Sequence, residues 1–219
     1  MTYTGHVVPG GPADVRTLRR ATIRKMAVSA MNNNVYLVTC TETGEQLLID
    51  AADDAPRCLA LVQEGTGRLD HLVTTHRHSD HVRALEDVAR ATGATTYAGA
   101  EDADALPVAP DVRLRHGDVV TVGVLELDVI HLRGHTPGSV ALSWADPDDG
   151  THLFTGDSLF PGGHGRTTTP EDHHSLMGDL EERVFAKHED DTWFYPGHGD
   201  DSTLGVERPS LAEWRARGW

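Results

Sequence analysis

Four side chains that can bind metal ions fall within six residues of this chain, in the run 75–81, Thr-His-Arg-His-Ser-Asp-His. His76 and His78 are two residues apart, so in an extended loop both can point to one side. Asp80 and His81 can turn toward a neighbouring point. Imidazoles and carboxylates at short, fixed spacing are ligands of zinc, iron and manganese ions. The pattern predicts a metal site that suits two adjacent ions better than one.

The flanking sequence predicts the elements that would position this cluster. The run 71–75 is short, apolar and rich in β-branched residues, which is typical of a strand. Apolar residues then recur at helical spacing over 82–89, which indicates an amphipathic helix. We therefore expect the cluster in a strand-to-helix connection. The alternative is that Ser79 or Asp80 is a helix N-cap, but three histidines beside one aspartate favour the metal.

Composition and charge narrow the class of protein. The chain has 219 residues, 38% of them hydrophobic and 24% charged, which predicts one globular domain over 1–219 with an extended arm over 1–20. A net charge of −15 disfavours nucleic acid as a partner. No apolar run reaches membrane-spanning length and no secretory signal is visible, so we expect a cytoplasmic protein with a small-molecule substrate. Cys40 and Cys58 are expected to be buried reduced thiols, with a disulfide left open.

The remaining sequence alternates between strand and helix patterns. Besides 71–75, strands are expected at 22–28, 35–40, 46–49, 95–97, 111–114, 118–132, 140–144, 152–154 and 192–195. Helices are expected at 54–64, after residue 81, and at 171–187 and 210–217, with a short helix or turn within 100–110. This order fits two sheets packed together and flanked by helices. The tail, with Trp214 and Trp219, is expected to pack on the body or on a partner subunit, as in a homodimer.

The run 75–81 resembles the signature of the metallo-β-lactamase-fold superfamily. Three further runs, 134–139, 154–160 and 195–199, match later motifs of that family in its order, Gly-His-Thr-Pro-Gly-Ser, Phe-Thr-Gly-Asp-Ser-Leu-Phe and Tyr-Pro-Gly-His-Gly. The resemblance is nearest to the glyoxalase II-like hydrolases and their persulfide dioxygenase relatives. It implies an α/β fold, a four-layer αβ/βα sandwich with metals at one edge between the sheets.

The resemblance also implies a set of ligands. Two divalent ions, Zn²⁺ or alternatively Fe or Mn, would be held by His76, His78 and His135 on one side, by Asp80, His81 and His198 on the other, and by Asp157 bridging both. Asp80 is in addition the candidate catalytic residue. Asp50 either supports the metal site from behind, as in this family, or caps the next turn. The other histidines are expected to be structural or surface residues: His6, His71, His116, His131, His152, His173, His174 and His188.

The function implied is a metal-dependent hydrolase that uses a hydroxide bridging two metals to attack a small thioester, ester or lactone. The alternative is an oxidoreductase similar to persulfide dioxygenases, with one iron on His76, His135 and Asp157. A non-catalytic metal-binding protein is a third possibility. His78 and Asp157 disfavour the flavin-linked di-iron reductases and the true zinc β-lactamases respectively.

Substrate recognition is expected near the Gly-rich run 160–167. His164 and Arg166 are the candidate substrate-binding residues, because the fixed fork of Arg166 suits a carboxylate; a structural role in the loop is the alternative. Glyoxalase II enzymes carry a C-terminal helical domain that binds the thiol tripeptide, whereas 21 residues follow His198 here. Glutathione-thioester specificity is therefore left open, whereas hydrolysis is still expected.

Overall fold

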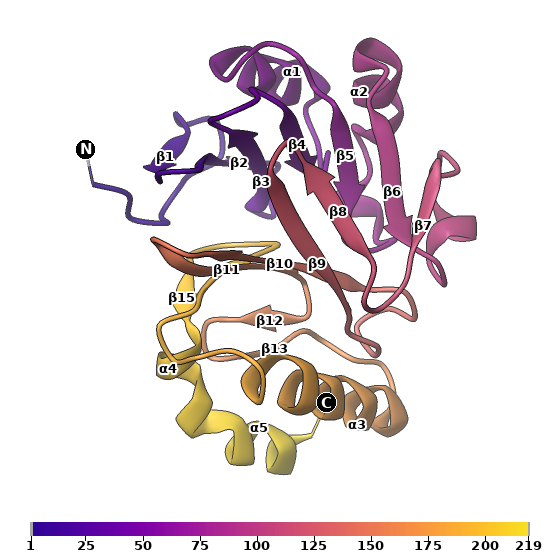
Figure 1. Ribbon diagram of the computed structural model, residues 1–219. Coiled ribbons are helices and arrows are strands. Elements are labelled where there is room, and N and C mark those ends of the chain that lie inside the picture. The colour runs from indigo at the N-terminus through magenta and orange to yellow at the C-terminus, as the bar shows by residue number, and fades with distance from the viewer. Residues whose placement is uncertain (1, 219) are drawn as a thin grey trace.

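Two β-sheets pack face to face in this computed structural model, which describes residues 2–218 (Figure 1). The first sheet has seven strands in chain order, with β1 to β4 antiparallel and β4 to β7 parallel. Helices α1 (Ala55–Glu64) and α2 (Leu85–Thr92) cover its outer face. The strands are β1 (Asp14–Thr17), β2 (Ala21–Val28), β3 (Asn33–Cys40), β4 (Gln46–Ile49), β5 (His71–Thr74), β6 (Thr95–Gly99) and β7 (Val112–Leu114).

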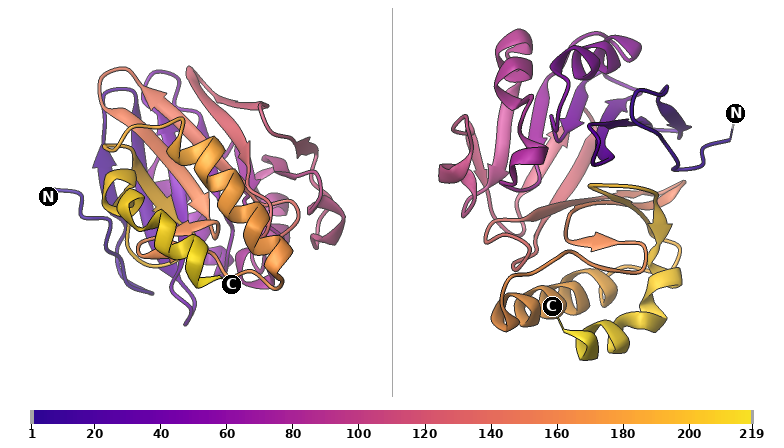
Figure 2. Two further views of the ribbon diagram at one scale, coloured as in Figure 1. Left: turned by 90° about the horizontal axis from the view of Figure 1, so that it is seen from below. Right: turned by 180° about the vertical axis from the view of Figure 1, so that it is seen from behind.

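The second sheet has six strands in the order β15-β14-β11-β10-β9-β8. Its outer face is covered by α3 (Pro170–Asp179), which continues as a π-helical segment (Leu180–Phe185), and by α4 (Leu204–Glu207) and α5 (Leu211–Arg217) (Figure 2). The strands are β8 (Val119–Val122), β9 (Leu125–His131), β10 (Val140–Asp146), β11 (Gly150–Gly156), β14 (Trp193–Pro196) and β15 (Ser202–Thr203). A small hairpin of β12 (Leu159–Phe160) and β13 (Gly163–His164) lies between this sheet and its helices.

The core follows from alternation along the strands. In β4, Leu47 and Ile49 point into the layer between the sheets, whereas Leu48 points outward under the helices. A third apolar cluster joins the second sheet to α3 and α5. Complete burial of one such side chain stabilises the fold by about 1.5–3 kcal/mol. Helices, sheet, sheet and helices thus form the four-layer αβ/βα sandwich that the resemblance implies, and this expectation is confirmed.

Two of the elements that the sequence predicts differ in the structure. The single strand expected over 118–132 is wrong, because the chain turns back at Gly123 and Val124 to form the β8–β9 hairpin. Gly123 has a φ of +61°, which a glycine adopts at little cost in a two-residue hairpin turn. Apolar residues at 119, 120, 122, 124 and 125 surround Gly123 and conceal that turn. The arm expected over 1–20 is extended in part, but Asp14–Thr17 pairs with β2 as the edge strand β1, and Met1 lies outside the described residues.

The tail and the cysteines agree with expectation. Trp214 is buried in the cluster under the second sheet and its ring lies 6.4 Å from that of Phe185, so the tail packs on the body; Trp219 lies outside the described residues. Cys40 and Cys58 are both buried and free. None of the helices within residues 2–218 has the length and apolar character that crossing a bilayer requires.

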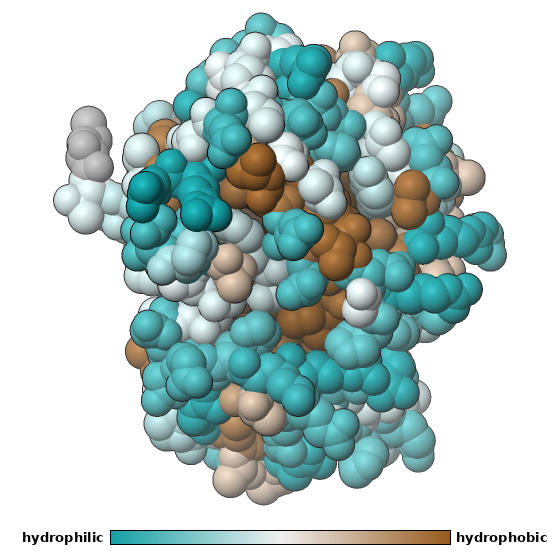
Figure 3. Space-filling view, viewed as in Figure 1, coloured by the Kyte–Doolittle hydropathy of each residue, from teal (hydrophilic) through white to brown (hydrophobic). Residues whose placement is uncertain are grey.

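The face shown in Figure 3 is largely hydrophilic, in keeping with the acidic composition. An apolar strip runs through its middle, in the region of the edge strands β7 and β8 of the two sheets. Partly exposed valines of this region are Val112, Val119 and Val124. β7 and β8 are short strands at the edges of the two sheets, and short edge strands limit pairing with other chains.

Candidate metal centre

The loop after β5 presents the first motif as expected, in a connection from a strand to a helix. β5 ends at Thr74, and Ser79–His81 form one turn of 3₁₀ helix before α2 begins at Leu85. Neither Ser79 nor Asp80 caps a helix: the residue before the 3₁₀ turn is His78, and no side-chain cap bond is formed there. Instead, Asp80 accepts a hydrogen bond from Asn33 at 2.9 Å. The N-cap alternative is therefore wrong.

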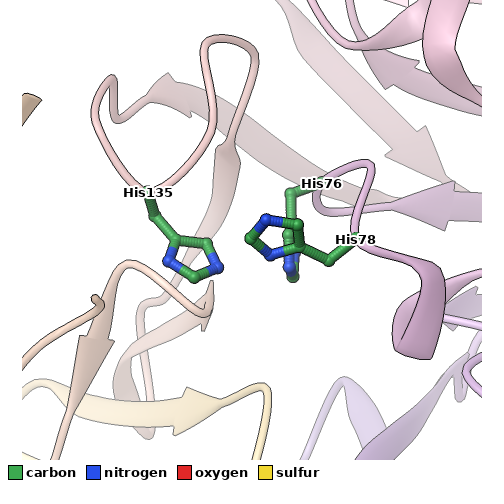
Figure 4. A group of neighbouring side chains, drawn as sticks. All are labelled: His76, His78 and His135. Atoms are coloured by element: carbon green, nitrogen blue, oxygen red, sulfur yellow. The ribbon is translucent and has the colours of Figure 1, made fainter. Parts of the chain in front are cut away.

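One group of three imidazoles gathers at this loop. His76 and His78 project from it toward His135, which comes from the connection between β9 and β10 on the opposite sheet (Figure 4). A nitrogen from each of the three rings lies within 4.8 Å of the others. His76 is fully buried and His78 is exposed, so the group spans the distance from the core to solvent.

A second group lies beside the first. One ligand atom each from Asp80, His81 and His198 lies within 4.8 Å of the others. Nε2 of His198 is 3.4 Å from Oδ2 of Asp80, and Nε2 of His81 is 3.6 Å from the same oxygen. His198 follows β14 of the second sheet, so this group also joins the two halves of the sandwich.

Asp157 lies between the two groups, directly after β11. Its Oδ2 is 3.9 Å from Nε2 of His76 and 3.6 Å from Nε2 of His135. On the other side, its carboxylate oxygens lie 3.3 Å from Nε2 of His81 and 3.3 Å from Nε2 of His198. Gly197 is necessary here, because a Cβ at that position would lie 2.0 Å from Oδ1 of Asp157. The structure thus brings all seven predicted ligand residues together around one carboxylate.

The hydrogen bonds of the rings fix which nitrogen faces the centre. Nδ1 of His81 lies 2.9 Å from Asp50, that of His198 2.9 Å from the Met31 carbonyl, and that of His135 2.8 Å from the Arg166 carbonyl. These acceptors require a proton on Nδ1, so a neutral ring carries its lone pair on Nε2. Orienting partners of this kind are typical of histidines that bind metals.

The donor set fits divalent metal ions. Nε2 of His76, Nε2 of His135 and Oδ1 of Asp157 are buried and have no hydrogen-bond partner among residues 2–218, which is costly unless something else binds them. Adjacent ligands about 2.0–2.2 Å from a metal ion are separated by roughly 3.0–3.6 Å. The separations around Asp157 are close to this range. Imidazole nitrogens with carboxylate oxygens suit zinc, iron or manganese.

The electrostatics of the centre are strongly perturbed. Burial, followed by the neighbouring ring of His81, holds the pKa of His76 well below its usual value, and burial lowers that of His135. Burial would also lower the pKa of His81, but Asp157 and Asp50 outweigh it and raise the value to about 10. Burial alone would raise the pKa of Asp157; the rings of His198 and His81 hold it well below the usual range. The carboxylate is therefore ionised at neutral pH.

Asp50 supports the cluster from behind, which was one of the two roles that the sequence left open. It is buried, accepts hydrogen bonds from the backbone N–H and the hydroxyl of Thr75, both at 2.7 Å, and contacts Nδ1 of His81. It does not cap the next helix, because the N-cap of α1 is Asp54. Asp50 thereby couples the end of β5 to the second group.

Asn33 is a residue of the site that the sequence did not predict, and the two candidate substrate residues, His164 and Arg166, differ in their surroundings. Asn33 is buried and its amide nitrogen lies 3.4 Å from Nε2 of both His81 and His198, besides its bond to Asp80. An asparagine at the first position of a strand carries no sequence signal for this role. The candidate substrate residue His164 lies in β13 with its ring 4.9 Å from that of His173, whereas the Arg166 side chain is exposed.

Comparison with known proteins supplies the family. The model of the metallo-beta-lactamase superfamily matches residues 28–198. A hydroxyacylglutathione hydrolase of Cereibacter sphaeroides is 40% identical over 135 residues, which are 62% of this chain and 51% of that protein. The enzyme of the same name from Rhodopseudomonas palustris is 38% identical over 170 residues, 76% of this chain and 62% of that protein. The chain thus spans about half to three fifths of the length of these curated relatives.

Solved structures extend the likeness. ETHE1 from Myxococcus xanthus superimposes with a TM-score of 0.77 at 29% identity, over 89% of this chain and 84% of that one. TTHA1623, solved in a di-iron-bound form, gives a TM-score of 0.68 at 30% identity, over 83% of this chain and 95% of that one. The matched motifs, the sandwich and the family model agree: the chain belongs to the metallo-beta-lactamase superfamily.

Proposed function

We propose that this protein is a metal-dependent hydrolase of small thioesters, esters or lactones, with two divalent ions in its centre. His76, His78 and His135 would hold one ion, Asp80, His81 and His198 the other, and Asp157 both. The observation that carries the proposal is the position of Asp157, whose carboxylate lies 3.3–3.9 Å from imidazoles of both groups. One carboxylate shared by two sets of ligands suits a pair of ions better than a single one.

Bound divalent ions activate water at neutral pH and polarise the carbonyl of the substrate. The residues of the chain orient and balance this chemistry. Asp80 and Asp157 supply negative charge that offsets the repulsion between two cations. Burial raises the pKa of Asp80, but the amide of Asn33 and the rings of His81 and His198 lower it overall, so its carboxylate is ionised and can accept a proton from the attacking water.

Arg166 is the residue that we propose for anchoring an anionic part of the substrate. Its carbonyl oxygen accepts the hydrogen bond from Nδ1 of His135, so its backbone adjoins the first group. Its side chain is exposed, and no ion pair of this guanidinium occurs among residues 2–218. His164, in contrast, packs on His173 of α3 and is less available to a substrate.

The relatives support a hydrolase and leave the metal open. Relatives about 40% identical carry the name hydroxyacylglutathione hydrolase, which favours an acyl-transfer reaction to water. A structural relative of similar length was solved with two irons, which supports two ions in this family. We propose Zn²⁺ as the native ion. Iron and manganese are the alternatives, because histidines and carboxylates bind all three metals.

A second candidate is an oxidoreductase with one iron, similar to persulfide dioxygenases. His76, His135 and Asp157 form a set of two imidazoles and one carboxylate on one side of the centre, as in non-haem iron oxygenases. The likeness to ETHE1, which covers most of both chains, favours this reading.

Activity assays separate the candidates. The purified protein is offered a panel of thioesters, esters and lactones, with and without a carboxylate, and hydrolysis is followed before and after removal of metal by a chelator. The proposal predicts hydrolysis that disappears on metal removal and returns with Zn²⁺. Oxygen consumption with a persulfide, together with no hydrolysis, would favour the second candidate instead.

A further inference from the structure

Asp102 is a fully buried carboxylate that none of the motifs includes. It lies after β6, at the start of a 3₁₀ turn (Ala103–Ala105), and its residue exposure is 0%. Burying a carboxylate is costly unless hydrogen bonds or opposite charges compensate for the lost water. Its partners therefore indicate what the carboxylate does.

Three hydrogen bonds reach Asp102, and they come from two loops. The backbone N–H of Arg77 donates to Oδ2 at 3.0 Å. The hydroxyl of Thr136 donates to the same oxygen at 2.5 Å, and the backbone N–H of Gly138 donates to Oδ1 at 2.9 Å. The Arg77 guanidinium adds positive charge, with Nε 3.6 Å from Oδ1. The carboxylate thus ties the loop after β5 to the loop after β9.

Both loops carry ligand residues of the first group. Arg77 lies between His76 and His78, so a bond to its N–H fixes the peptide that separates them. Thr136 follows His135 directly. We propose that Asp102 is a positioning residue for the first metal site, which sets the separation of His76 and His78 from His135. The inference rests on the proposed metal binding, and Asp102 itself lies outside the candidate ligand set.

Close packing around Asp102 supports this assignment. A Cβ at Gly138 would lie 2.3 Å from the backbone nitrogen of Asp102, and a Cβ at Gly99 would lie 1.9 Å from the carbonyl oxygen of Gly138. The His135 loop therefore approaches the end of β6 without any side chain between them. The backbone N–H of Val140 also donates to the Thr75 carbonyl at 2.9 Å. Thr136 and Gly138, both in the run 134–139, thus form this junction between the His135 loop and the end of β6.

The proposed contribution of Asp102 is specific to one site. The second group is oriented by other residues, since Asp50 contacts His81 and the Met31 carbonyl accepts from His198. An asparagine at position 102 is nearly the same size, but its NH₂ group must face a donor. Because two of the three partners are backbone N–H groups, Asp102→Asn leaves at least one of them unsatisfied.

The test is Zn²⁺ binding by the full chain, measured as competition with a chromophoric chelator. Asp102→Asn should weaken the affinity of one site about 10–100-fold, as other partners that orient metal ligands do. In a His198→Ala background, which disrupts the second group, the same weakening should appear. In a His135→Ala background, which disrupts the first group, Asp102→Asn should add no further loss.

A control matched in its hydrogen bonds is Asp111→Asn, because that carboxylate, on an exposed residue, also accepts from a backbone N–H and a hydroxyl, those of Thr96, both at 2.8 Å. It should leave both affinities unchanged. If Asp102→Asn fails to fold, Thr136→Val and Thr136→Ser replace it. The serine keeps the hydroxyl and should bind like the wild type, while the valine should weaken the first site.

The outcomes separate this inference from the proposed function. Affinities of Asp102→Asn within twofold of the wild type, or a further loss in the His135→Ala background, would overturn the positioning role alone. Equal affinities of Thr136→Val and Thr136→Ser would do so as well. A wild-type protein that binds no Zn²⁺ would overturn the proposed function, and the positioning role with it.

Discussion

Nε2 of His81 and Nε2 of His198 face each other at 3.0 Å. Because Nδ1 of each ring adjoins an oxygen acceptor, two neutral rings would oppose two lone pairs. A proton or a metal ion must therefore lie between them. Metal and proton compete for the same atoms, which links metal binding to pH.

The metal-free protein should lose stability as the pH rises from 7 to 10. The pKa of His81 is raised from 6.5 to about 10 in the folded state, so its proton stabilises the fold fully below pH 6.5 and is lost as the pH passes about 10. Thermal unfolding across this pH range would measure the loss of stability of the metal-free protein, with the Zn²⁺-loaded protein as the reference. The gap in stability between the two forms should widen; a constant or narrowing gap would contradict this reading.

Replacing Asp50 should weaken the second site more than the first, because Asp50 contacts His81 directly but reaches Nδ1 of His76 only through the Thr75 hydroxyl, 3.0 Å from that nitrogen. Asp50→Asn cannot accept from both donors of Thr75 and from His81, so the ring of His81 loses its fixed orientation. We expect about 10–100-fold weaker binding at one site in Zn²⁺ titrations. Asp146→Asn is the control, because Asp146 is also buried and accepts from the N–H of Asp148, in the β10–β11 turn. Loss of binding in both variants would argue for a general effect on folding.

Removal of the Arg166 guanidinium should change KM and leave kcat largely intact. For a substrate with a carboxylate, Arg166→Ala should raise KM about tenfold, because an interaction present in both the bound substrate and the transition state is removed. A neutral ester should be unaffected. Arg90→Ala, on the exposed surface of α2, is the control. The anchoring role fails if both substrates respond alike.

The buried pair of Lys25 and Asp201 should be required for stability. Both side chains are 0% exposed, and Nζ of Lys25 also donates to the carbonyls of Gly5 and Gly199, each at 2.6 Å. Lys25→Met would leave the Asp201 carboxylate buried without its cation. We expect a loss of about 3–5 kcal/mol in the free energy of unfolding by urea.

Two further variants define this effect. Lys187→Met, at an exposed position, should change the stability by less than about 0.5 kcal/mol. Lys25→Met combined with Asp201→Asn should recover part of the loss, because no charge is left buried. If the single variant at Lys25 is as stable as the wild type, the pair does not stabilise the fold.

The parts of the site that the sequence predicts are those whose signal is local. His76, His78, Asp80 and His81 are neighbours in the chain, and a strand before them with a helix after them places them in one loop. His135, Asp157 and His198 lie in different loops, and only the family resemblance connected them to this cluster. Their convergence in the structure agrees with that expectation, while their roles as ligands stay predictions.

The supporting residues could not be predicted, because their partners are far away in the sequence. Asn33 and Asp80 are 47 residues apart, and Lys25 and Asp201 are 176 apart. In the sequence, Asp102 looks like an ordinary turn residue, because the two loops that it joins are distant from it in the chain. The missed β8–β9 hairpin has a different cause, since one glycine in an apolar run gives little warning of a turn.

The most direct test of the account is the metal content of the wild-type protein, purified without added metal or chelator and measured by elemental analysis. The arrangement around Asp157 predicts about two divalent ions per chain, and about one in Asp157→Ala, which keeps the six other ligands. Wild-type protein with two zinc ions would support the hydrolase. A single iron per chain, or no bound metal after incubation with Zn²⁺, Fe²⁺ or Mn²⁺, would contradict the dinuclear centre.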